Sequence, residues 1–202
     1  AHRARVARLD GGPDRRYPPL TGSLADRVVL ITGSSRGIGA EVAAKAAAEG
    51  AELIVGSLPA VLASGVELGP RKTLLRGAAH AGEALGRSGL CLGHAMAQAV
   101  GGRYGLPHGA MNALCLPAAL RFNEPVAPEA IQTFGKAIAT DDPVERVQQL
   151  AHLGGFARLR DFGVPENELD DVAEATAVRG GARANPRPAS PAEIAELFRE
   201  IY

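Results

Sequence analysis

Tryptophan is absent from this chain of 202 residues, and aromatic residues make up only 4% of it. Proteins that bind single-stranded nucleic acid stack its bases on aromatic rings, so the composition argues against that function. Lys plus Arg equal Asp plus Glu at 22 each, so the chain has no net positive charge that would attract nucleic acid or an anionic membrane. We find no apolar run of membrane-spanning length and no signal-peptide pattern. We therefore expect neither a nucleic-acid partner nor a membrane.

Cysteine is also scarce: Cys91 and Cys115 are the only two, and neither belongs to a CxxC pair. Both stand in apolar surroundings, which is typical of buried, reduced thiols. The sequence therefore favours a cytoplasmic protein.

The first 23 residues are rich in Arg, Gly and Pro, with arginines at Arg3, Arg5, Arg8, Arg15 and Arg16. This composition predicts a flexible basic tail over residues 1–23 rather than a nucleic-acid-binding arm.

Residues 24–57 have the pattern of a partial βαβ unit. An apolar run at 27–32 predicts a buried strand, a glycine-rich turn and an Ala-rich helix ending at Gly50 follow, and 53–55 predicts a second strand. A turn between a strand and a helix binds phosphate through free N–H groups at the helix start. The candidate cofactor-binding residues are Gly33, Ser35, Arg36, Gly37, Ile38 and Gly39. A purely structural turn is the alternative.

This turn, Thr-Gly-Ser-Ser-Arg-Gly-Ile-Gly, resembles the cofactor turn of short-chain dehydrogenases/reductases. In that family a basic residue at the position of Arg36 goes with the 2′-phosphate of NADP. The resemblance ends near residue 56, and the family's Tyr-x-x-x-Lys pair is absent, so a complete enzyme of that kind is excluded.

Residues 58–202 predict an all-α domain, because helical segments separated by Gly and Pro replace any convincing strand. The fold class we expect is mostly α, a helical domain preceded by a partial Rossmann-like unit. The expected helices span 70–86, 89–101, 109–121, 127–139, 143–153, 155–162, 166–178 and 191–201.

Two histidines form the most informative pattern of this region. His94 and Gln98 are four residues apart and share one face of a helix, and His108 starts the next helix after the Gly101-Gly102 break. Two imidazoles so placed are candidate ligands for one divalent metal ion, although core or capping roles remain open.

The surrounding segments, from Gly89 to Asn112 and on to Asn123, resemble the helical domain of iron-containing alcohol dehydrogenases and of the metal-free maleylacetate reductases. The resemblance implies that His94 and His108 bind the metal, which would be Fe²⁺ or Zn²⁺. Gln98 stands where many members have a further histidine near the substrate, which makes it the candidate catalytic residue. The family's other two ligands, an Asp and a His on an earlier helix, have no counterpart in this chain.

The resemblance implies an NAD(P)-dependent oxidoreductase that transfers hydride between nicotinamide and a small alcohol or carbonyl substrate with metal assistance. The missing ligands predict that this activity is incomplete in a single chain, and a homo-oligomer is left open. Two alternatives remain: a non-catalytic fragment or fusion remnant, and a nucleotide-binding module that uses only the glycine-rich turn.

Overall fold

The computed structural model describes residues 38–202, with side chains from residue 45 onward. Over this range the chain is helical and contains no strand. The elements are α1 (Ile38–Ala63), α2 (Leu68–Ser88), α3 (Leu92–Tyr104), α4 (His108–Asn123), α5 (Pro128–Ala137), α6 (Pro143–Leu153), η2 (Leu159–Phe162), η3 (Glu166–Glu168), α7 (Leu169–Ala177), α8 (Gly180–Arg183) and α9 (Pro191–Glu200).

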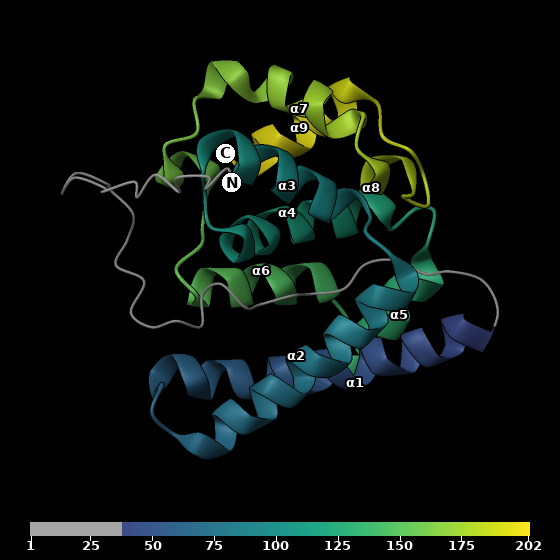
Figure 1. The fold of residues 1–202 in the computed structure, drawn as a ribbon, viewed down its shortest axis with the longest axis vertical. Helices are drawn as coiled ribbons and strands as arrows, with labels where there is room; N and C mark the ends of the chain where they lie inside the picture. Colours follow the sequence, from purple (N-terminus) through teal and green to yellow (C-terminus); the bar gives the residue numbers. More distant parts are fainter. Residues whose placement is uncertain (1–37) are drawn as a thin grey trace, which may run out of the picture.

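The helices are stacked in layers (Figure 1). The long α1–α2 hairpin lies at one end of the molecule, α6, α4 and α3 follow, and α7 with α9 covers the other end. Helix α4 is central to this stack, because 13 of its 16 residues are buried. It is apolar all round, as expected for a helix with neighbours on every side.

Two hydrophobic clusters meet at α4. One contains α3, α4, α7 and α9 side chains around Met96, Met111 and Phe198. The other joins α1, α2, α5 and α6, and α4 contributes Leu116 and Leu120 to it. Helix α4 therefore links the two halves of the core.

Side-chain caps explain where the later helices begin. The carboxylate of Asp142 accepts a hydrogen bond from the backbone N–H of Glu145, 2.9 Å away, directly before Pro143 at the start of α6. Ser190 and Glu193 form a reciprocal capping box at the start of α9. The bounds of α6, Pro143–Leu153, are those predicted from the sequence.

The prediction of a strand at 53–55 is wrong, since these residues lie within α1. Gly50 does not end the helix either. Its lack of a side chain lets α2 approach, because a Cβ atom there would lie 2.9 Å from the backbone nitrogen of Ala81. The apolar residues Ile54, Val55, Leu58 and Val61 recur at helical spacing and are buried in the second cluster. A short apolar run fits a buried helix as well as a strand, and here packing against α2 decides between them.

The expectation that no segment is long and apolar enough to cross a membrane also needs correction. Lys45–Ala63 of α1 passes that test by length and composition, with 44% of the segment buried. Since its apolar residues pack against α2, α5 and α6, it has the character of a core helix.

Candidate functional site

The predicted pair of histidines comes together at the junction of α3 and α4. His94 is the third residue of α3 and His108 is the first of α4. Helix α3 continues through Gly101-Gly102, where a break was predicted, and ends at Gly105, whose φ of 65° places it in the left-handed region. The reversal there brings α4 back along α3, and the ring centroids of the two histidines lie 6.2 Å apart at an interplanar angle of 48°.

The two imidazoles have different surroundings. His94 is 5% exposed, whereas His108 is exposed at the start of its helix. Burial lowers the pKa of His94, and the charge of a protonated His108 lowers it further. His94 is therefore neutral at neutral pH, with one ring nitrogen free to accept a hydrogen bond or to bind an electrophile.

Asn112 completes this cluster, and sequence reasoning missed it. It lies one turn after His108, is buried, and donates its side-chain N–H to Nε2 of His108 over 2.9 Å. The spacing of four residues on a helix was the signal that could have found it. Gln98, one turn after His94 on the same face of α3, is half-buried.

A second polar network positions the start of α3. Asn185 and Asn123 are buried and exchange side-chain amide hydrogen bonds of 2.6 and 3.1 Å. The side-chain oxygen of Asn185 also accepts from the backbone N–H of Leu92 at 3.3 Å, two residues before His94. The segment after α8 thereby fixes the beginning of α3 against the end of α4.

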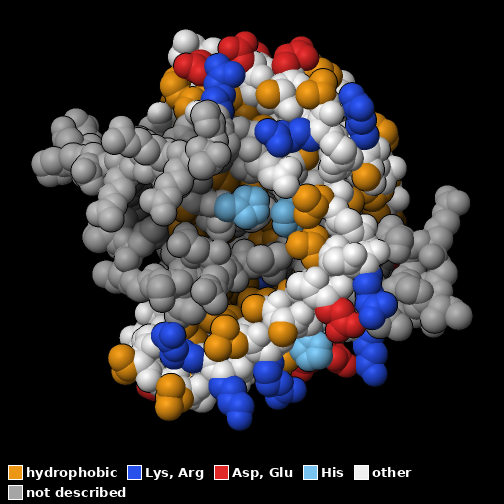
Figure 2. Space-filling model, viewed as in Figure 1, with side chains coloured by type: hydrophobic (Ala, Val, Ile, Leu, Met, Phe, Trp, Pro, Cys, Tyr) orange, Lys and Arg blue, Asp and Glu red, His pale blue; other side chains and the backbone are white. Residues whose placement is uncertain are grey.

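On the face drawn in Figure 2, histidine surface lies in the middle of the molecule, between the α1–α2 hairpin and the helices beyond it. Another histidine, His80, belongs to the hairpin itself, where Nδ1 of its ring faces the carboxylate of Glu49 at 3.9 Å. It takes no part in the α3–α4 junction.

The described residues do not form a complete metal site. Residues 45–202 contain no group of three or more His, Cys, Asp or Glu side chains able to hold an ion, and zinc sites in proteins use about three or four protein ligands. The hydrogen bond from Asn112 also occupies the lone pair on Nε2 of His108. The pair is therefore half of a site at most.

The predicted phosphate-binding turn lies mostly outside the described residues. Gly33, Ser35, Arg36 and Gly37 precede them, while Ile38 and Gly39 are the first two residues of α1. Their role in cofactor binding stays a prediction.

Comparison with known proteins identifies the family to which this helical fold belongs. Residues 39–202 match the model of the Fe-containing alcohol dehydrogenase family, C-terminal. The chain belongs to this family. The matched region begins well before residue 58, the predicted start of the helical domain, and includes most of α1.

Relatives in this family include a maleylacetate reductase of Pseudomonas sp. (strain P51), 31% identical over 157 residues, which cover 77% of this chain and 44% of the relative. A 1,3-propanediol dehydrogenase of Citrobacter freundii is 33% identical over 169 residues, with coverage of 78% and 44%. The crystal structure of a 1,3-propanediol oxidoreductase superposes with a TM-score of 0.79 at 28% identity, covering 89% of this chain and 49% of that one. The chain thus spans about half the length of the relatives it matches.

Proposed function

We propose that the chain is the helical part of an NAD(P)-dependent oxidoreductase that interconverts a small alcohol and the corresponding carbonyl compound. The observation that carries the proposal is the meeting of His94 and His108 at the α3–α4 junction, inside the region that matches the family. Family members are named for the oxidation of 1,3-propanediol and the reduction of maleylacetate. We take these two compounds as the first substrates to test, with a cytoplasmic location as expected from the sequence.

The reaction moves a hydride between the nicotinamide and the substrate carbon, and one proton moves at the substrate oxygen. His94, neutral and buried, is suited to hydrogen-bond that oxygen. Gln98 has an amide, which donates and accepts hydrogen bonds but does not exchange a proton at neutral pH. We therefore assign Gln98 to orienting the oxygen, and the proton must be exchanged with another group.

Because the described residues supply at most two imidazoles at the α3–α4 junction, and Asn112 engages Nε2 of one of them, we derive no step through a metal. Fe²⁺ or Zn²⁺ would require ligands from elsewhere. This deficit is also the observation that favours the alternative, a non-catalytic chain that at most binds a nucleotide through its glycine-rich turn.

The decisive assay measures nicotinamide absorbance with 1,3-propanediol or maleylacetate as substrate, using the purified chain before and after anaerobic loading with Fe²⁺ or Zn²⁺. We expect turnover that His94→Ala and His108→Ala abolish. The variant His80→Ala removes an imidazole on α2, away from the junction, and should leave turnover unchanged.

Absence of turnover with every substrate and cofactor, together with retained NADPH binding, would support the non-catalytic alternative. In that case Gly37→Val should abolish the binding, because the added side chain would stand where the pyrophosphate approaches the turn.

A further inference from the structure

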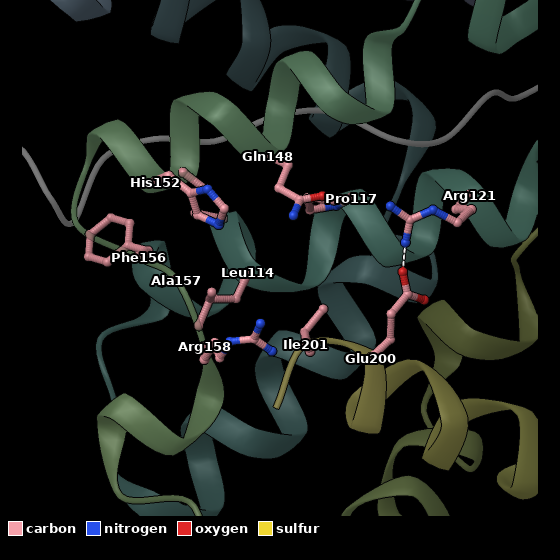
Figure 3. Close-up of a pocket in the computed structure, with 12 residues that line it drawn as sticks. Leu114, Pro117, Arg121, Gln148, His152, Phe156, Ala157, Arg158, Glu200 and Ile201 are labelled. Carbon is pink, nitrogen blue, oxygen red and sulfur yellow. Dashed lines mark ion pairs between the residues drawn. The ribbon is translucent and has the colours of Figure 1, made fainter.

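A cavity of about 330 Å³ lies on the other side of α4 from the histidine pair. Helix α4 forms one wall, α6 another, and the segment before η2 and the end of α9 close it (Figure 3). Each residue turns about 100° around a helix, so Leu114, Pro117 and Arg121 face away from His108 and Asn112. The cavity is therefore distinct from the candidate site.

Three polar side chains lining this cavity have no hydrogen bond or ion pair with any residue that the structure describes. Gln148 and His152 are four residues apart on α6 and extend from one wall, and Arg158 lies across from them (Figure 3). In contrast, Arg121 is neutralised by an ion pair with Glu200. Among the described residues, the guanidinium of Arg158 has no carboxylate partner.

The remaining wall is apolar, with Leu114, Phe156 and Ile201 among its side chains. A guanidinium binds a carboxylate through two parallel hydrogen bonds, while an amide and an imidazole hydrogen-bond neutral oxygens. An apolar wall between these groups suits a short hydrocarbon chain.

From this arrangement we propose that the cavity binds a small organic acid whose far end carries a hydroxyl or carbonyl oxygen. The carboxylate pairs with Arg158, the distal oxygen hydrogen-bonds Gln148 and His152, and the carbon chain lies along Leu114. This binding site goes beyond the proposed function, because it involves neither His94 nor the glycine-rich turn.

Isothermal titration calorimetry with the straight-chain acids from 3-hydroxypropanoate to 6-hydroxyhexanoate tests the proposal. The matched diols lack the carboxylate, and the matched unsubstituted acids lack the hydroxyl. We expect at least one hydroxy acid to bind more tightly than either of its analogues. Arg158→Ala should weaken its binding by about tenfold to a hundredfold, the usual effect of losing a charged hydrogen bond.

Arg160→Ala is the matched control, because Arg160 is an exposed arginine two residues further on that does not line the cavity. It should bind the acid like the parent chain, as should His94→Ala, whose imidazole lies across α4. Gln148→Leu should weaken the binding of the hydroxy acid but leave the binding of the unsubstituted acid unchanged. The proposal is overturned if no acid binds the folded chain, if the Arg158→Ala variant binds the hydroxy acid with the affinity of the parent chain, or if His94→Ala abolishes binding.

Discussion

Asn112 donates a hydrogen bond from Nδ2 of its side chain to Nε2 of His108, 2.9 Å away and one turn earlier on α4. An amide nitrogen only donates, so Nε2 of His108 is the acceptor and the ring proton resides on Nδ1. The contact therefore orients the ring and favours the tautomer of His108 that carries its proton on Nδ1.

Replacing Asn112 with leucine, which has a similar size and no donor, should release this tautomer. We expect the Nε2-protonated form of His108 to increase, as measured by long-range ¹H–¹⁵N correlation spectra of the imidazoles. His152 belongs to α6 and serves as the internal control. An unchanged His108 spectrum would show that Asn112 does not set the tautomer.

The crossing of α1 and α2 depends on two glycines without side chains. A Cβ atom on Gly77 would lie 2.8 Å from Cγ1 of Ile54 and 3.0 Å from the backbone oxygen of Gly50. Gly77→Ala should therefore lower the free energy of unfolding by about 1–3 kcal/mol, the usual cost of overpacking. Urea unfolding measures the change.

Gly82 lies on the same helix, but a Cβ atom there would meet nothing within 4 Å. Gly82→Ala should raise the free energy of unfolding by about 0.5–1 kcal/mol, because alanine has the higher helix propensity. If both alanine variants changed stability equally, close packing at Gly77 would not be the cause.

The carboxyl group of Glu193, at the start of α9, makes the stability of the fold depend on pH in the acid range. The hydrogen bond from Arg187, followed by those from the backbone and side chain of Ser190, lowers the pKa of its carboxyl from 4.5 to about 2. A lowered pKa in the folded state stabilises the fold above pH 4.5, and this contribution disappears as the pH falls from 4.5 to about 2.

Arg187→Ala should raise the pKa of Glu193 toward 4.5, since the largest cause of the shift is removed. The titration of the Glu193 side-chain carboxyl carbon by ¹³C NMR reports it directly. Arg183→Ala removes an exposed arginine of α8 and should leave the titration where it is. A pKa that stays near 2 in the Arg187 variant would assign the shift to Ser190 instead.

Both cysteines should resist alkylation in the folded chain. Burial raises the pKa of Cys91 and, more strongly, that of the fully buried Cys115, so the reactive thiolate is scarce at neutral pH. We expect iodoacetamide to modify neither residue until urea unfolds the protein, as read by mass spectrometry of peptides. Rapid native modification of Cys115 would mean that α4 opens locally.

The later helices could be predicted because their ends carry strong local signals. The caps at Asp142 and Ser190, each followed by proline, locate α6 and α9. The break predicted at Gly101-Gly102 is wrong, because glycine lowers the stability of a helix without ending it, and α3 buries Gly101 in the core. The expected helix 155–162 is reduced to the 3-10 turn η2, and Gly155, where that helix was expected to begin, has a positive φ of 85°.

The histidine pair could be predicted because both residues flank one short connection. The cavity could not, since its lining comes from segments of α4, α6, 156–158 and α9 that are far apart in the sequence. The α1–α2 hairpin was missed for the same reason: the contact that makes residues 50–58 helical is with Gly77 and Ala81 of another helix.

The burial of α4 on all sides constrains how this protein can vary. A substitution on the His108 side must preserve the junction with α3, and one on the Leu114 side must preserve the cavity and the contact with α6. In a library of random variants, positions 109–120 should therefore yield the fewest folded clones, while the exposed face of α2 accepts many. The exposed positions of this helix are at its ends, where Arg121 is the one whose replacement should disturb folding least.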